Sequence, residues 1–390
     1  MSRKIRLFVV GPTPPPFHGV ATFIRDLLAA QHPRVETLHL DTSDRRDTDN
    51  IGRWDPTNLQ LGFANLSDLA ARSLRADIDA VYVPISQNVP AFLRDALFVL
   101  EARALGKKVI IHLHGGYFRT LYEQQNAVFQ TAARGALNCA AAVLVLGKEF
   151  VPIFEGLVPD EKIHVVENGV PDPGAWLLRE VGRQTGLSAS PVEAAAQTSA
   201  ALLYMGTLTR TKGVLELVQA FALLRATRPA LRLRIAGRWA EADLRNETEA
   251  FIARENLSAH IDFVGNVDGA SKAEFLASGS IFCLPTRYPF EGQPLVLLEA
   301  MAAGLPVLST QHGAIPSTVL DGVSGRLLIK ECTPQQIAAA LDAMLGDETT
   351  LCAMSAAARQ RYLEFYTLQV CHERLFKIVE AACSPVASKS

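Results

Sequence analysis

The chain has 390 residues, of which 49% are hydrophobic and 20% are charged. A chain of this length exceeds the size at which one hydrophobic core keeps growing, so we expect two folded domains. The 38 basic and 40 acidic side chains nearly cancel, and this balance argues against a protein that binds nucleic acid through its backbone.

Cysteine spacing and the lengths of apolar runs indicate where in the cell the protein is expected to act. The six cysteines include no C-x-x-C pair, so we interpret them as reduced thiols of a cytoplasmic protein. The first apolar stretch is short and ends at Gly11-Pro12, which favours a β-strand over a signal peptide. No apolar run approaches the roughly 20 residues that cross a bilayer.

Short aliphatic runs alternate with longer stretches of helical periodicity, and this alternation predicts parallel sheets covered by helices. The strands expected in the first half are 5–10, 35–40, 80–85, 108–113, 142–146 and 163–166. Those expected in the second half are 201–204, 231–236, 261–264, 281–284, 306–309 and 326–329. Each half is therefore predicted to form an α/β domain with a doubly wound sheet.

Proline, glycine and serine gather between the halves, from Pro171 to Pro191, and predict a linker. We expect a Rossmann-like N-terminal domain at 1–178 and a Rossmann-like C-terminal domain at 179–365. A helix and tail at 366–390 should return toward the first domain. Because ligands of such sheets bind beyond the carboxyl ends of the strands, the site should lie in loops that follow strands, in a cleft between the domains.

The loop after expected strand 201–204 has features of a phosphate site. Gly206 ends the strand, Arg210 and Lys212 follow, and Gly213 opens a helix. Backbone N–H groups at a helix start, beside two cations, suit a diphosphate. The dinucleotide and P-loop patterns are absent. A simple strand–helix turn with solvated basic residues is the alternative.

Two carboxylates lie eight residues apart in "EGQPLVLLEAMAAG", which follows expected strand 281–284. Glu291 belongs to the loop, whereas Glu299 lies inside a helix and is costly to bury without a partner. Vicinal ribose hydroxyls could satisfy Glu299, and Glu291 could hold hydroxyls of an attached sugar. The backbone N–H groups expected to face the same ligand are those of Gly292, Gln293 and Leu295.

These motifs together resemble a known family. The segment "EGQPLVLLEAMAAGLPVLST" resembles the E-x7-E signature of retaining glycosyltransferases of the family 4 type, which have the GT-B fold of two facing Rossmann-like domains. "MGTLTRTKGVLELVQAF" is similar to the family's phosphate loop, "VVENGV" to the segment before its linker, and "IDFVGNV" to its base-contacting turn. The resemblance covers essentially the whole chain.

The resemblance implies roles for the residues of the second half. Glu299 would bind the ribose of a nucleotide sugar and Glu291 the donor sugar. Lys212 would bind the diphosphate with help from Arg210, because Thr207 stands where the family has an arginine. Lys212 and Glu291 are accordingly expected to be catalytic, and Val267 lies in the base-contacting turn.

In the first half, His114 matches a histidine that the family places near the donor's anomeric carbon, and we count it as catalytic. Its alternative is an ordinary hydrogen-bonding residue at a strand end. Gly19 matches one glycine of the family's first loop and is expected to bind the donor. Ser317 occupies a position that is acidic in the family, so that residue's usual role is not transferred.

The expected reaction moves a sugar from a UDP- or GDP-hexose to a hydroxyl of a glycan or lipid-linked acceptor, with retention, in cell-surface polysaccharide or glycolipid synthesis. Front-face attack assisted by the leaving phosphate is favoured over a covalent sugar ester. The alternatives are a nucleotide-sugar epimerase or a phosphorylase on the same fold, and a non-catalytic sugar-nucleotide-binding protein. The residues name neither the base, the sugar nor the acceptor.

No cofactor or metal is expected. Two Asp-x-Asp sequences, Asp47-Thr48-Asp49 and Asp77-Ile78-Asp79, are weak metal candidates. The first lies in a polar loop, and the second precedes a strand at the end away from the expected site.

The acceptor is expected to meet the first domain, where Phe92, Tyr117 and Phe118 follow strands. The helical stretch 91–108 carries an apolar stripe together with basic residues. It either covers the sheet, which we favour, or contacts the cytoplasmic face of the inner membrane peripherally.

Overall fold

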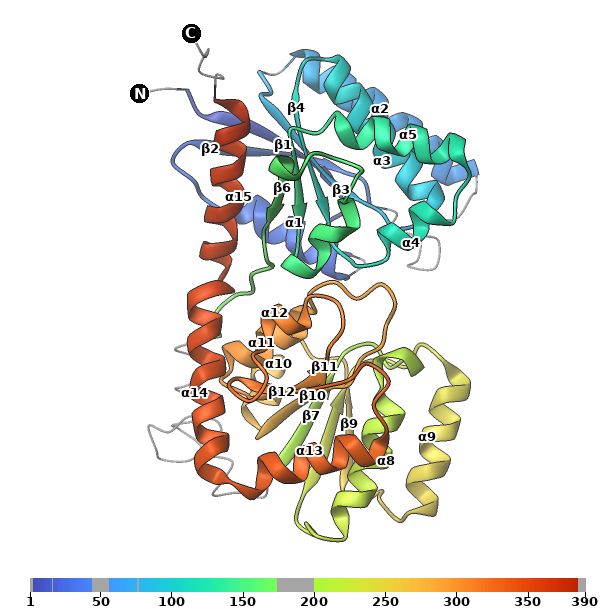
Figure 1. Cartoon of the computed structure of the whole chain (residues 1–390), viewed down its shortest axis with the longest axis vertical. Coiled ribbons are helices and arrows are strands. Elements are labelled where there is room, and N and C mark those ends of the chain that lie inside the picture. The colour runs from blue at the N-terminus through green and yellow to red at the C-terminus, as the bar shows by residue number, and fades with distance from the viewer. Residues whose placement is uncertain (1–2, 16, 44–55, 76, 174–199, 385–390) are drawn as a thin grey trace. The chain divides into compact units, whose positions relative to one another are not determined.

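The structure is a computed structural model that describes residues 3–15, 17–43, 56–75, 77–173 and 200–384 (Figure 1). The chain divides into two compact units. Unit 1 comprises Met1–Gly169 and Leu368–Ser390, and unit 2 comprises Val170–Thr367. The expected boundary between residues 178 and 179, most of the expected linker and the last residues of the tail lie outside the described residues.

Unit 1 is built on a six-stranded sheet whose strands lie in the order β2-β1-β3-β4-β5-β6. Neighbouring strands pair in parallel. The strands are β1 (Ile5–Gly11), β2 (Val35–Asp41), β3 (Ala80–Ile85), β4 (Lys108–Leu113), β5 (Ala142–Val145) and β6 (Ile163–Val165). The central strands are buried nearly throughout, because helices cover both faces of a parallel sheet.

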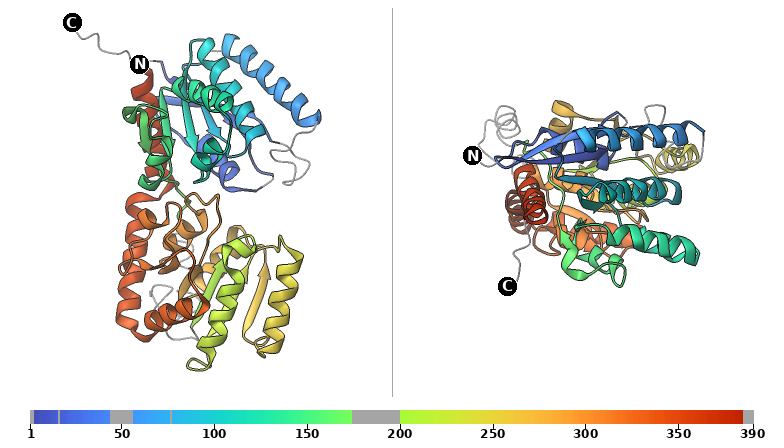
Figure 2. Two further views of the ribbon diagram at one scale, coloured as in Figure 1. Left: turned by 45° about the vertical axis from the view of Figure 1, so that its right-hand side comes forward. Right: turned by 90° about the horizontal axis from the view of Figure 1, so that it is seen from above.

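The helices of unit 1 form two layers around this sheet (Figure 1). They are α1 (Gly19–Ala29), α2 (Pro56–Arg75), α3 (Val89–Ala104), α4 (Phe118–Glu123), α5 (Ala127–Asn138) and α15 (Leu368–Cys383), with short 3₁₀ segments η2 (Lys148–Phe154) and η3 (Asp160–Lys162). Helix α15 comes from the end of the chain, yet its Leu375, Phe376 and Val379 join the same buried cluster as β1 and α1 (Figures 1 and 2). Unit 1 therefore contains both ends of the sequence.

Unit 2 contains a second six-stranded parallel sheet, in the order β12-β11-β10-β7-β8-β9. Its strands are β7 (Ala201–Met205), β8 (Arg232–Ala236), β9 (Ile261–Gly265), β10 (Ile281–Leu284), β11 (Val307–Thr310) and β12 (Gly325–Leu328). Its helical segments are η4 (Arg210–Lys212), α8 (Val214–Arg225), α9 (Ala242–Arg254), α10 (Gly269–Ala277), α11 (Leu295–Ala302), α12 (Ile315–Thr318), α13 (Pro334–Gly346) and α14 (Glu348–Phe365).

Each of the twelve strands expected from the sequence is present in the described part of the chain, within a residue or two of its expected bounds. The predicted α/β class with two doubly wound sheets is confirmed. In each sheet the direction of winding reverses once, between β1 and β3 in unit 1 and between β7 and β10 in unit 2. Ligands of such sheets bind beyond the carboxyl ends of the strands at this reversal.

Candidate active site

Lys212 and Glu291 meet at the winding reversal of the unit 2 sheet, one after β7 and the other after β10. The Lys212 ammonium donates to both carboxylate oxygens of Glu291, at 3.0 Å to Oε1 and 2.8 Å to Oε2. The Thr286 hydroxyl donates to Oε2 at 2.8 Å. Glu291 is only 6% exposed, so these donors replace the water that the carboxylate has lost.

Two glycines let the loops approach closely enough to form this arrangement. Gly213 has φ 76°, and a Cβ there would lie 2.2 Å from the carbonyl oxygen of Pro285. Gly313 has φ 58°, and its Cβ would lie 2.6 Å from the carbonyl oxygen of Gly292. Glycine is suited to both positions because it adopts positive φ without strain and has no side chain to clash. The loops after β7, β10 and β11 thus pack backbone against backbone.

Tyr288 completes the surroundings of the ion pair. Its ring lies 5.0 Å from the Lys212 ammonium, a distance at which an aromatic face attracts a cation. A ring nitrogen of His312, Nε2, contacts the Tyr288 carbonyl oxygen at 2.7 Å. Burial, and then the Glu291 carboxylate, raise the pKa of Tyr288. Sequence reasoning missed Thr286 and Tyr288, although both precede Glu291 in the same loop.

Glu299 lies on α11 and pairs with a lysine that the sequence did not indicate. The Lys272 ammonium, from α10, donates to Glu299 Oε1 at 2.8 Å, and both side chains are partly exposed. Gly304 has φ 75° directly after α11, as expected of a helix end. The Gln293 side chain donates to the Thr318 hydroxyl at 2.9 Å inside the core, so this amide is held away from solvent.

The structure separates the two cations that the sequence grouped in one phosphate loop. The Arg210 guanidinium is exposed and pairs with Glu247 of α9 at 2.6 Å, whereas Lys212 pairs with Glu291. The side chains of residues two apart in the η4 turn point different ways. Lys212 is consequently the cation that contacts Glu291.

The other predicted donor-binding residues sit at strand ends or helix starts. Gly206 directly follows β7, Val267 follows β9 and packs partly buried against the core, and Leu295 begins α11. Gly292 is buried in the loop after β10. In unit 1, Gly19 begins α1, and no atom lies within 4 Å of where its Cβ would be.

His114 follows β4 in unit 1 and belongs to a buried polar cluster. The Tyr82 hydroxyl lies 3.1 Å from His114 Nε2 and 2.8 Å from His112 Nδ1. Burial, and then the nearby His18, lower the pKa of His114 to about 3. His114 is therefore an uncharged imidazole at neutral pH, and its side chain is partly exposed.

Two of the three predicted acceptor aromatics belong to the core instead. Phe92 is 1% exposed and Phe118 is 0% exposed. Their ring centroids are 5.1 Å apart, and Phe118 also stacks on Phe154. Because these rings pack on each other and on Phe154 of η2, they stabilise unit 1 and do not reach an acceptor. Tyr117 is partly exposed, and its backbone N–H donates to the Gln87 side chain.

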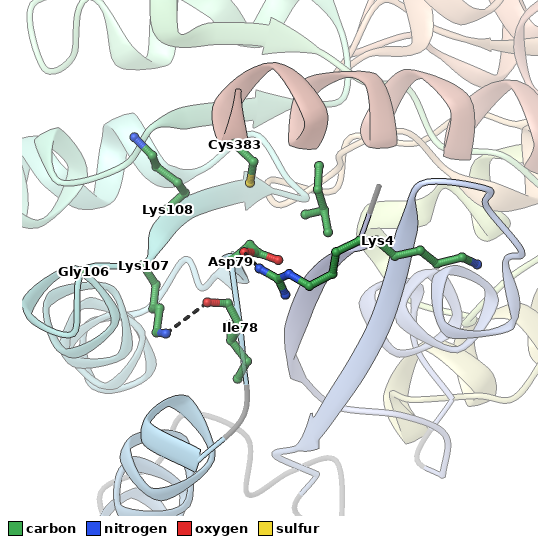
Figure 3. A pocket seen from close by; sticks show the side chains of 9 residues that line it. Lys4, Ile78, Asp79, Gly106, Lys107, Lys108 and Cys383 are labelled. Carbon is green, nitrogen blue, oxygen red and sulfur yellow. Dashed lines mark hydrogen bonds and ion pairs between the residues drawn. The ribbon is translucent and has the colours of Figure 1, made fainter. Parts of the chain in front are cut away.

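The second Asp-x-Asp sequence has a structural role. Asp79 accepts from Arg3 at 2.6 Å and from the backbone N–H of Arg6 at 2.8 Å, which ties β1 to the start of β3. Figure 3 shows Asp79 in a pocket with Lys4, Lys107 and Lys108 at the amino ends of the strands. Asp47-Thr48-Asp49 lies outside the described residues. Among those that are described, no group of three or more His, Cys, Asp or Glu side chains could hold a metal.

Helix α3, which contains most of the predicted membrane-contacting stretch 91–108, packs on β3 and β4 of the unit 1 sheet. Arg94 pairs with its neighbour Asp95 at 2.7 Å, and Lys107 donates to the Ile78 carbonyl at 3.0 Å. Leu97 and Leu100 are exposed. None of the helices in the described ranges is both long and apolar enough to cross a membrane. A peripheral membrane contact and a cytoplasmic location stay predictions.

Comparison with known proteins assigns the reaction class. Residues 189–361, which include Lys212, Glu291 and Glu299, match the family model described as glycosyl transferases group 1. The chain is similar to an alpha-maltose-1-phosphate synthase of Mycobacterium tuberculosis, at 27% identity over 358 residues that cover 83% of this chain and 86% of that protein. The present chain is a glycosyltransferase.

A second relative matches this glycosyltransferase along nearly its whole length. It is a GDP-mannose-dependent monoacylated alpha-(1-6)-phosphatidylinositol monomannoside mannosyltransferase of Corynebacterium glutamicum, 23% identical, with 97% of this chain and 98% of that protein covered. Among solved structures, Anabaena HepE in complex with UDP aligns with a TM-score of 0.73 and 16% identity over 97% of this chain and 100% of that chain. The predicted GT-B fold is confirmed.

Proposed function

We propose that this glycosyltransferase moves a hexose from a nucleoside-diphosphate sugar to a hydroxyl of a glycan or lipid-linked acceptor, with retention at the anomeric carbon. The observation that carries the proposal is the Lys212–Glu291–Thr286 arrangement at the winding reversal of the unit 2 sheet. The complexes of Anabaena HepE with UDP and with UDP-glucose, and the GDP-mannose-dependent relative, support a nucleotide-sugar donor.

Lys212 has the chemistry to bind the leaving diphosphate. Its ammonium carries three N–H donors, and Glu291 accepts two bonds from it, so a third donor is available for phosphate. Lys212 also directly precedes Gly213 and the start of α8, where backbone N–H groups favour an anion. Negative charge that develops on the diphosphate as the sugar leaves would be stabilised there.

Glu291 and Glu299 divide the recognition of the donor. A carboxylate offers about four lone-pair positions, and Glu291 accepts one bond at Oε1 and two at Oε2. Oε1 can therefore accept a further bond from a sugar hydroxyl. Lys272 contacts Glu299 at Oε1, and we assign Oε2 to the vicinal hydroxyls of the ribose.

The transfer step breaks the bond between the anomeric carbon and the phosphate oxygen and forms one to the acceptor oxygen on the same face. The acceptor proton passes to the departing phosphate oxygen. Glu291 is held by Lys212 and Thr286, which supports sugar recognition over nucleophilic attack. His114 takes the role that the family resemblance implies, contact with the sugar near its anomeric carbon.

The deciding experiment incubates the purified chain with a panel of labelled UDP- and GDP-hexoses, with and without bacterial glycan and lipid extracts. We expect labelled product only when donor and acceptor are both present, and unchanged rates in EDTA. Conversion of the donor without acceptor would favour an epimerase, and dependence on inorganic phosphate would favour a phosphorylase. A bound but intact donor in every mixture would contradict the proposal.

A further inference from the structure

Three side chains of unit 1 form a hydrogen-bonded row inside the sheet. Tyr82 on β3 lies between His112 on β4 and His114 just beyond it, at 2.8 Å from His112 Nδ1 and 3.1 Å from His114 Nε2. The two imidazole rings are 3.9 Å apart between centroids, and the Phe23 ring packs edge-on against both. Tyr82 and His112 are fully buried, so His114 is the member of the row that a ligand can reach.

All three groups are uncharged at neutral pH. Burial, and then the Cys371 thiol, raise the pKa of Tyr82 well above its usual value. Burial, and then His114, lower the pKa of His112 well below its usual value. The row therefore contains one phenol proton and one N–H proton on each ring.

A single phenol proton allows only two complete arrangements. In the first, His112 Nδ1–H donates to the Tyr82 oxygen, and the Tyr82 hydroxyl donates to His114 Nε2, so the His114 proton is on Nδ1. In the second, every bond runs the other way, and both rings carry their protons on Nε2. The tautomers of His112 and His114 are thus coupled through the Tyr82 hydroxyl.

The environment of the second ring nitrogen of His112, Nε2, distinguishes these two arrangements. His112 Nε2 is buried and has no hydrogen-bond partner among the described residues. The second arrangement would leave an N–H donor there, whereas the first leaves a bare lone pair. Among buried backbone groups, unpaired N–H donors are rarer than under-used carbonyl acceptors, and we extend this preference to the ring nitrogen, which favours the first arrangement.

We propose that Tyr82 and His112 are positioning residues that hold His114 in the Nδ1–H tautomer. His114 then offers a hydrogen-bond donor at Nδ1 to an oxygen of its ligand, and cannot accept at that atom. The use of this donor in sugar transfer rests on the proposed function, whereas the tautomer does not.

The tautomer can be measured directly on the full chain without any substrate. Two-bond ¹H–¹⁵N correlation spectra of ¹⁵N-histidine-labelled protein near neutral pH identify which ring nitrogen carries the proton, and a His114→Gln variant assigns the His114 signals. We expect protons on Nδ1 of both His112 and His114. A proton on Nε2 of either ring would overturn the proposal.

Tyr82→Phe removes the hydroxyl and keeps the ring. We expect His114 to lose its fixed tautomer and show Nε2–H signal. Persistence of the Nδ1–H form would overturn the role of Tyr82. Tyr122→Phe is the matched control, because Tyr122 is a buried tyrosine of the same unit that contacts Arg134 and neither histidine; its histidine spectrum should not change. If Tyr82→Phe does not fold, the wild-type spectrum still decides the tautomer.

Activity then tests the functional half separately. Partners that orient a metal-bound histidine typically contribute about 10- to 100-fold to affinity or activity, and we take the same range for the orientation of His114. We expect Tyr82→Phe to lower kcat within that range and to leave the donor KM within a fewfold of wild type. If the wild type has the Nδ1–H tautomer but Tyr82→Phe leaves kcat unchanged, the use of this donor in transfer would be overturned. Absence of transferase activity in the wild type would instead refute the proposed function, and the spectra would still test the tautomer.

Discussion

Lys212 and Glu291 compensate each other's charge where both are largely removed from water. Neither side chain would be stable there alone, because an unpaired buried charge is strongly unfavourable. The same pair can serve a ligand, since the ammonium retains a donor and the carboxylate an acceptor. Stability and recognition of the donor are therefore coupled at these two residues.

Replacing the lysine tests its role toward the diphosphate. We expect Lys212→Ala to lower kcat/KM by about 10² to 10³, the effect of losing a group that stabilises charge in the transition state. Lys212→Arg keeps the charge and should retain more activity than the alanine variant. Steady-state kinetics with the donor found in the panel would measure both, and an alanine variant within tenfold of wild type would remove Lys212 from this role.

Alanine substitutions of the two glutamates should have different effects on binding and on turnover. Glu299→Ala should weaken the affinity for free nucleoside diphosphate, because the ribose loses its acceptor. Glu291→Ala should mainly lower kcat and alter the choice of sugar. Isothermal titration with UDP and GDP separates these effects. Equal losses of nucleoside diphosphate affinity in both variants would contradict the assignment.

At the scale of elements, loops and strand ends carry the candidate site, and rigid neighbours hold them. The turn between β7 and α8 lies against the loop after β10, with Gly213 at the contact. In unit 1, His112 lies on β4 and is buried in the core, and His114 lies just beyond the carboxyl end of the same strand. Small changes at these element ends should therefore have measurable effects on stability.

Adding one methyl group at the β7–α8 turn tests the backbone contact. We expect Gly213→Ala to destabilise unit 2 by more than the roughly 1 to 2 kcal/mol that a left-handed backbone costs alanine, because its Cβ would also meet the Pro285 carbonyl. Gly322→Ala is the matched control, with φ 75° and no atom within 4 Å of its Cβ. Urea unfolding of both variants measures the difference, and equal losses would show that the contact adds nothing.

The histidines on and just after β4, His112 and His114, should make stability depend on pH. The folded pKa of His114 is about 3, below its usual 6.5, so between these values the unfolded chain binds more protons than the folded one. The free energy of unfolding should therefore fall as pH falls below about 6.5, by up to about 1.4 kcal/mol per pH unit for each such histidine. Urea unfolding between about pH 6.5 and 5 should show a smaller slope in His114→Gln than in wild type. Identical slopes would contradict an uncharged His114.

At the scale of the whole molecule, the chain completes its first unit with its last helix. Leu375, Phe376 and Val379 of α15 are buried against the unit 1 sheet, although the whole of unit 2, Val170–Thr367, separates α15 from the rest of unit 1. Unit 1 therefore reaches its final packing only when the whole chain is available.

A cavity in this last helix should destabilise unit 1 selectively. We expect Phe376→Ala to cost about 3 to 5 kcal/mol, as large-to-small changes of buried aromatics do. Hydrogen exchange read by mass spectrometry should show faster exchange in β1 and α1, with unit 2 unchanged. Leu363→Ala on α14, an exposed leucine of unit 2, is the control and should leave unit 1 exchange unaltered.

Local sequence patterns were sufficient for much of the fold and part of the candidate site. The aliphatic runs located every expected strand in the described ranges, because strands covered on both faces must be apolar along their length. The glycine–lysine turn and the glutamates at 291 and 299 follow strands of the same sheet. Because the strands are parallel, segments that follow them lie at the same edge of the sheet, at the carboxyl ends of the strands.

Side-chain partners depended on contacts between distant residues. Sequence reasoning missed Lys272 and Thr286, and it grouped Arg210 with Lys212, whereas the fold pairs Arg210 with Glu247. It also assigned Phe92 and Phe118, which follow strands, to the acceptor, but both rings are buried in the core, where removing their apolar area from water is favourable. The amino-acid sequence by itself determined the strands, their sheets and which loops can meet. Only the tertiary structure decided which charges pair and which tautomer the His112–Tyr82–His114 row favours, because these depend on atoms brought together from different strands and helices.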